Sequence, residues 1–143
     1  METKSDSMPE LMCPSAQPDL RRGLVVGVVG GTVGEPRLAY LKKPISVDET
    51  VIKQASPVKP TEVFRLSAPC ANQGCQHFDG ASCRLARRIV ELLDPVVGEL
   101  PSCHLRSSCR WWMQEGAEAC LRCPQIVTEL YGSTPIQEKV ARP

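Results

Sequence analysis

Seven of the eight cysteines and both histidines of this 143-residue chain lie within one stretch, residues 70–123. Thiolates and imidazoles are the ligands that zinc, copper and iron–sulfur centres prefer in proteins, whereas magnesium and calcium prefer oxygen ligands. The stretch therefore predicts a bound metal ion or an iron–sulfur cluster. The candidate ligands are Cys70, Cys75, His77, Cys83, Cys103, Cys109, Cys120 and Cys123.

The spacing of these ligands leaves two kinds of centre open, with an iron–sulfur cluster as the leading interpretation and zinc as the alternative. Structural zinc sites usually use two short Cys-x2-4-Cys pairs, and Cys103-x5-Cys109 falls outside that range. Iron–sulfur clusters accept wider spacing, because a cluster is larger than one ion and its ligands arrive from several loops. A zinc arrangement would use two sets of ligands: Cys70, Cys75, His77 and Cys83, then Cys103, Cys109, Cys120 and Cys123.

The end of the pattern, Cys120-x2-Cys123-Pro124, resembles the end of some ferredoxin motifs over five positions. The Cys-x2-Cys-x2-Cys run of those motifs is absent, so the resemblance carries over no fold and no residue role.

Cys13 and the two histidines are judged as candidate ligands by their positions in the sequence. Cys13 is far from the other cysteines in sequence, and we expect a free surface thiol there, with a ligand that folds back onto the cluster as the alternative. His77 is included because it follows Cys75 by two residues. His104 directly follows Cys103, which is too close to reach the same ion comfortably, and we expect it at the surface.

Charged and aromatic residues accompany the cysteines. Arginines would offset the negative charge of a cluster, and tryptophans would shield it from water, which tunes the reduction potential. The alternative roles are a solvated face for the arginines and ordinary core packing for the tryptophans. The residues concerned are Arg84, Arg106, Arg110, Arg122, Trp111 and Trp112.

Catalytic motifs are missing. The chain has no Gly-x-Ser-x-Gly, no His-Glu-x-x-His and no zinc-deaminase signature. A thiol oxidoreductase is a weaker alternative, because Cys120-x2-Cys123 ends a predicted helix, where the helix dipole does not stabilise a thiolate. We therefore expect an electron-transfer, redox-sensing or enzyme-accessory protein rather than an enzyme.

The composition of the chain limits its cellular location and the kinds of partner it could bind. The 17 basic and 16 acidic residues nearly balance, so binding to nucleic acid is weakly supported and would use the arginines of 84–88. Residues 1–20 contain no apolar signal segment, and the apolar run 24–29 is far shorter than the ~20 residues that span a bilayer. We expect a cytoplasmic protein with no membrane association and with a protein partner, either a redox partner or a larger enzyme.

Periodicity predicts an α+β fold, in which a small β-hairpin and helix region packs on a Cys-rich, mainly helical, metal-binding region. Residues 24–29 and 37–41 flank a glycine-rich turn and predict a hairpin. Ser46 and Glu49 resemble a capping box for a helix over 47–55. Further along the chain we expect a strand over 61–66, a helix over 81–94, a helix that starts near 109, and a helix over 117–123.

The predicted organisation has four parts. A flexible tail covers 1–22, the hairpin, helix and strand region covers 23–68, the Cys-rich helical region covers 69–131, and a loose tail covers 132–143.

Overall fold

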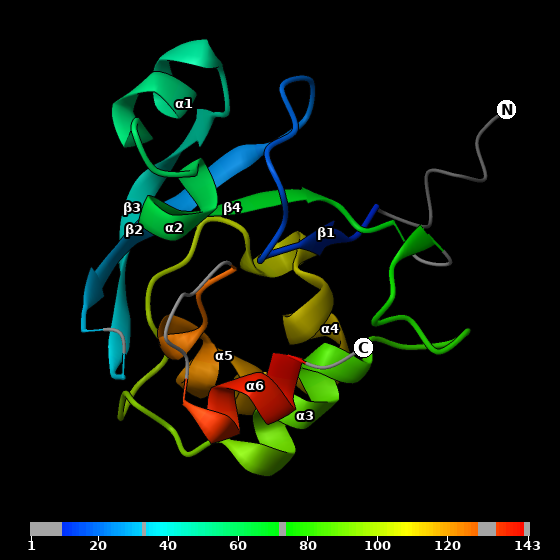
Figure 1. The fold of residues 1–143 in the computed structure, drawn as a ribbon. Helices are drawn as coiled ribbons and strands as arrows, with labels where there is room; N and C mark the ends of the chain where they lie inside the picture. The colour runs from blue at the N-terminus through cyan, green and yellow to red at the C-terminus, as the bar shows by residue number, and fades with distance from the viewer. Residues whose placement is uncertain (1–9, 33, 72–73, 129–133, 142–143) are drawn as a thin grey trace, which may run out of the picture.

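Residues 10–32, 34–71, 74–128 and 134–141 are described by the computed structural model, and they form an α+β fold (Figure 1). Four antiparallel strands make one sheet in the order β1-β4-β2-β3. The strands are β1 (Met12–Cys13), β2 (Leu24–Gly31), β3 (Pro36–Ser46) and β4 (Phe64–Pro69). The helices are α1 (Glu49–Ala55), α2 (Pro60–Val63), α3 (Arg84–Leu92), α4 (Arg110–Glu115), α5 (Ala117–Arg122) and α6 (Pro135–Ala141), with 3-10 turns at Arg106–Ser108 and Cys123–Gln125.

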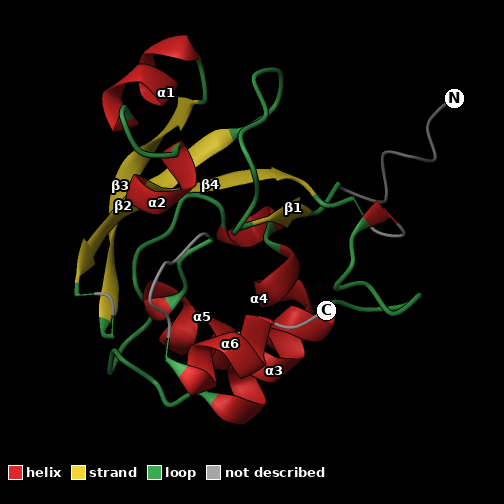
Figure 2. Ribbon diagram, in the orientation of Figure 1, coloured by secondary structure: helices red, strands yellow, loops and turns green. Residues whose placement is uncertain are grey.

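The sheet separates two apolar clusters, because successive side chains of a strand point to opposite faces. Val25 packs with Val47, Val51 and Leu66 in the smaller cluster. The neighbouring Val26 packs in the larger cluster, which the helical layer completes. Figure 2 shows this layer, α3 to α6, gathered away from α1 and α2. The larger cluster comprises Val26, Leu38, Ala86, Ile89, Leu105, Cys109, Trp111, Ala119, Cys123 and Val140.

The predicted hairpin is present, with a longer second strand than the sequence indicates. β3 continues to Ser46, because Val25 pairs with Ile45 at the start of β2. The register shifts between Val25 and Gly27, as at a β-bulge. At Gly27 a Cβ atom would lie 2.4 Å from the carbonyl oxygen of Ala39, so glycine permits the close approach of the two strands.

The segment after the hairpin differs from the prediction in two places. Ser46 belongs to β3, and the N-cap of α1 is Asp48, whose side chain accepts a 3.0 Å hydrogen bond from the Val51 amide. The expected strand over 61–66 is divided. Residues 60–63 form the short helix α2, and β4 begins at Phe64 and runs to Pro69, directly before Cys70.

Parts of both predicted tails are ordered elements. Met12 and Cys13 form β1 against the end of β4, whereas residues 1–9 of the predicted flexible tail lie outside the described residues. Near the other end, α6 packs on the helical layer, and its Val140 is only 3% exposed. Thr134 and Gln137 bond reciprocally at the start of α6, each backbone amide donating to the side chain of the other.

The predicted helices of the Cys-rich region are present with shifted ends. α3 begins at Arg84, and Cys83 is its N-cap rather than a residue of its first turn. α4 begins after Cys109, and Gly116, with φ of 70°, separates it from α5. None of the helices in the described ranges is long and apolar enough to cross a bilayer.

Candidate functional site

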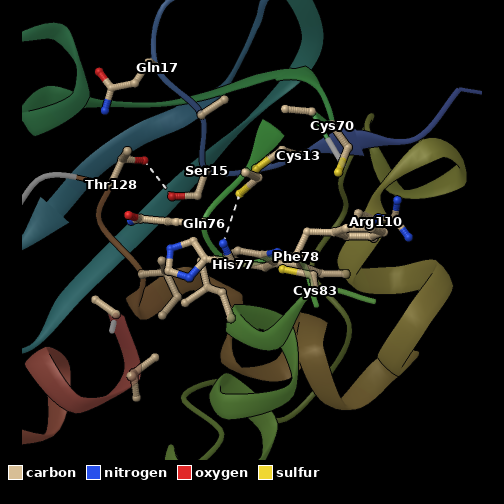
Figure 3. A pocket seen from close by; sticks show the side chains of 18 of the residues that line it. Cys13, Ser15, Gln17, Cys70, Gln76, His77, Phe78, Cys83, Arg110 and Thr128 are labelled. Carbon is tan, nitrogen blue, oxygen red and sulfur yellow. Dashed lines mark hydrogen bonds between the residues drawn. The ribbon is translucent and has the colours of Figure 1, made fainter. Parts of the chain in front are cut away.

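Four cysteines, which we call the first thiol group, line one cavity of about 770 Å³. Figure 3 labels three of them, Cys13, Cys70 and Cys83. They come from four separate segments of the chain. Cys13 ends β1, Cys70 directly follows β4, Cys75 lies in the loop after it, and Cys83 is the N-cap of α3. The fold thus collects thiols that are up to 70 positions apart in sequence.

Strand pairing brings Cys13 to this cavity. In the antiparallel register Met12 lies opposite Pro69 and Cys13 lies opposite Ala68. The Cys70 amide extends the pairing by donating a 2.9 Å hydrogen bond to the carbonyl oxygen of Leu11. Cys13 is therefore not the isolated surface thiol that the sequence predicts, because the pairing of β1 with β4 holds it beside the end of β4.

Gln114 of α4 fixes the position of Cys83. The Gln114 side-chain oxygen accepts from the Cys83 amide at 2.8 Å, and its side-chain nitrogen donates to the Cys83 carbonyl at 2.8 Å. Phe78 also forms a β-bridge with Cys83, which closes the loop that precedes α3. Both backbone polar groups of Cys83 are satisfied, so its side chain is held at the cavity wall.

Two thiols of the first group have raised pKa values in the metal-free chain. Burial is the main cause that raises the pKa of the Cys13 thiol to about 11, and the thiols of Cys83, Cys70 and Cys75 contribute in the same direction. Burial likewise raises the pKa of Cys83 above its ordinary value. A metal binds the thiolate, so metal binding at Cys13 and Cys83 would release protons.

His77 lines the same cavity, but it contacts a thiol through its backbone. The His77 amide donates to the sulfur of Cys75 at 3.4 Å. Figure 3 shows its ring across the cavity from Cys70. His77 thus supports Cys75 from the main chain, and its role as a ligand stays a prediction.

The other four cysteines form the second thiol group, around a small cavity of about 20 Å³. Cys109 is the N-cap of α4, Cys120 lies on α5, and Cys123 begins the 3-10 turn that follows. Cys109 and Cys123 are buried. Burial raises the pKa of Cys109 to about 12 and also raises that of Cys120. The group is Cys103, Cys109, Cys120 and Cys123.

A buried arginine from the sheet contacts the second thiol group. Arg65 of β4 is 0% exposed, and one terminal nitrogen donates to the sulfur of Cys123 at 2.6 Å. Its guanidinium lies over the Trp111 ring, 5.3 Å from the centroid. Burial by itself would lower the pKa of Arg65, but Cys123 and Tyr40 outweigh it and the pKa is raised. Arg65 is therefore a buried cation beside a thiol.

The geometry of the two groups constrains any bound centre. All eight cysteines are free thiols. Within the described ranges, no three His, Cys, Asp or Glu side chains are close enough to hold a single metal ion. The structure thus collects the predicted ligands in two places, whereas metal binding itself stays a prediction.

Comparison with known proteins gives no family. No protein-family model matches the chain, and neither the curated proteins nor the solved structures include a significant match. The two thiol groups are therefore the features from which a function can be inferred.

Sequence reasoning did not single out Arg65, gave Cys13 as a ligand only as the alternative, and expected His104 at the surface. The pair Met12-Cys13 carries no strand signal, because two residues show no periodicity. Arg65 looks like the polar position of a half-buried strand, although both faces of β4 are covered. His104 is half-buried, and its Nε2 lies 3.0 Å from the carbonyl oxygen of Val25, so it fastens the Cys103 loop to β2.

Proposed function

We propose that this chain is an iron–sulfur protein whose first thiol group holds a cluster that exchanges electrons with a protein partner. The observation that carries the proposal is the convergence of four thiols, from four segments, on one cavity of about 770 Å³. Ligands that arrive from several loops are typical of iron–sulfur clusters. The four sulfur atoms at this cavity come from a strand, two loops and the start of a helix.

The size of the cavity supports a cluster over a single zinc ion. A structural zinc ion needs four ligand atoms about 2.0–2.3 Å away, arranged as a tetrahedron. The described thiols and His77 are farther apart than that, and the cavity exceeds by far the volume of one ion. A centre with several metal atoms spans such a distance because each thiolate binds a different atom of it.

The proposed role is electron transfer or redox sensing, including service as an accessory to a larger enzyme. The first cavity is lined mainly by thiols, apolar side chains and amides, and His77, Arg110 and Glu138 also lie at its wall. The free cysteines fit a cytoplasmic location, where thiols stay reduced.

The test is anaerobic purification followed by measurement of iron, acid-labile sulfide and zinc per chain. We expect brown protein with absorbance near ~400 nm, the signature of thiolate-ligated iron. The double variant Cys70→Ser/Cys75→Ser should lose the iron that the first thiol group holds. The proposal would be refuted by colourless protein that carries stoichiometric zinc and stays colourless after treatment with iron and sulfide.

A further inference from the structure

We infer that the second thiol group holds a separate, buried anionic centre, an iron–sulfur cluster bound by four thiolates, and that Arg65 and Arg106 are its built-in counter-cations. This inference stands on other residues than the proposed cluster site and does not require the first group to be loaded. A cluster with four thiolate ligands carries excess negative charge, and it accommodates ligands that are too far apart for one ion.

Arg65 needs an anion that no carboxylate supplies. It is fully buried, and within the described ranges it forms no ion pair with an acidic side chain. Its remaining donors reach the carbonyl oxygens of Pro14 at 2.6 Å, Cys123 at 2.8 Å and Ile126 at 2.9 Å. Carbonyls satisfy hydrogen bonds but do not neutralise a full charge, and an unpaired buried charge is strongly destabilising. The negative charge must come from the thiols beside it.

A charged donor contacts the sulfur of Cys123. Arg65 donates at 2.6 Å, and Tyr40 lines the same small cavity. A neutral thiol is a weak acceptor, whereas a thiolate accepts strong bonds from charged donors. A short bond from a buried guanidinium to this sulfur therefore matches a thiolate.

Arg106 is a second cation at the group. Its side chain lines the same small cavity as Cys120, and its guanidinium lies over the Trp112 ring, 5.5 Å from the centroid. One nitrogen of Arg106 donates to the carbonyl of Pro101, which fixes the side chain. Arg65 and Arg106 together supply two positive charges to offset the negative charge of a cluster with four thiolate ligands.

Two buried donors at the second group have no acceptor in the described part of the chain. They are Nε1 of Trp111 and Nε of Arg106. Trp111 is 2% exposed, and its ring lines the small cavity among the thiols. Buried N–H groups rarely stay unsatisfied. A lining rich in donors and poor in acceptors is complementary to anionic sulfur.

The test isolates the second group in the double variant Cys70→Ser/Cys75→Ser. One sample receives zinc alone, and another receives ferrous iron with sulfide under anaerobic conditions. We expect brown protein with one cluster per chain from the treatment with iron and sulfide, whereas a chain that binds only zinc would contradict the cluster. A correctly folded chain that binds neither overturns the inference.

The counter-cations are tested in the same background by competition for the metal that binds. Arg65→Met should weaken affinity by about tenfold or more, since removal of an outer partner of a metal ligand typically costs 10–100-fold. Arg65→Lys keeps the charge and should lose less. If Arg65→Met does not fold, the half-buried Arg106→Met provides the same test.

Arg122→Met is the matched control. Arg122 neighbours Cys123 in sequence, but its guanidinium bonds the Leu93 carbonyl and Glu118, so its removal takes the same charge away without a thiol contact. We expect its affinity to stay within about threefold of the background chain. Equal losses for Arg122→Met and Arg65→Met, or no loss for Arg65→Met, would contradict the role of Arg65. The reciprocal chain Cys109→Ser/Cys123→Ser tests the first group alone, so the two proposals can fail separately.

Discussion

Cys13 lies opposite Ala68 in the antiparallel pair of β1 and β4, and Ala68 precedes Cys70 by two residues. This register explains how a thiol near the start of the chain reaches a cysteine-rich stretch that begins more than fifty residues later. Because side chains alternate along a strand, a slip of one residue would turn Cys13 to the opposite face of the sheet. The pairing therefore specifies the fourth thiol of the first group.

Cys13→Ser should remove the first cluster as completely as Cys70→Ser does. A serine hydroxyl is a poor ligand for iron beside thiolates, and the three remaining thiols leave one coordination position without its ligand. His77→Ala is the comparison, because His77 contacts Cys75 through its backbone amide, which the substitution retains. Iron and sulfide per chain are the measurement. Iron loss in His77→Ala together with retention in Cys13→Ser would assign the fourth position to His77.

Gly27→Ala should destabilise the fold by about 1–3 kcal/mol, the usual cost of overpacking. The new Cβ would lie 2.4 Å from a backbone oxygen of Ala39 and 2.9 Å from Leu38 Cδ1. Gly30→Ala is the matched control on the same strand, since its nearest neighbour, the Arg37 oxygen, is 3.6 Å away. The control should change the free energy of unfolding by less than about 0.5 kcal/mol. Urea unfolding measures both variants, and similar values would contradict the close approach at Gly27.

Val140→Ala should cost about 2 kcal/mol of stability, because it removes buried methyl groups and leaves a cavity. Val140 lies in the larger core cluster with Ala86 and Ile89 of α3, and it also lines the first cavity. On the same helix Ile136 is 42% exposed, and Ile136→Ala should stay within about 0.5 kcal/mol of the parent. Thermal unfolding of the metal-free proteins separates the two. No difference between them would mean that α6 does not dock as described.

Asp19→Asn should destabilise the protein at neutral pH and lose its effect in acid. The Asp19 carboxylate accepts hydrogen bonds from the Arg22 and Arg21 amides, and these bonds lower its pKa below the ordinary 3.8. A carboxyl with a lowered folded pKa contributes stability above the unfolded pKa, and this contribution is lost as the pH falls through the folded value. Asparagine keeps the shape without the charge. Urea unfolding at about pH 7 and again below 3.8 is the measurement. A gap between Asp19→Asn and the parent that is independent of pH would exclude the charge as its cause.

The sequence by itself determined the fold class, the hairpin, the helical character of the Cys-rich region and the grouping of the later cysteines. These features depend on local signals. Glycines between β-branched runs indicate a hairpin, and apolar residues at helical spacing indicate α3. Cys103, Cys109, Cys120 and Cys123 are close along the chain, so short helices and turns suffice to bring them together.

Only the tertiary structure decided the places of Cys13, Arg65 and α6. Cys13 depends on a two-residue strand whose register is set by β4, more than fifty positions away. Arg65 is buried because the 3-10 turn at Cys123 covers its face of the sheet, and its acceptors are 51 to 61 positions away. Val140 is buried because α3 offers it an apolar surface. Each of these contacts joins segments that are distant in sequence, and the local sequence of neither segment indicates its partner. The contacts are therefore decided by tertiary packing, which overrides local propensity.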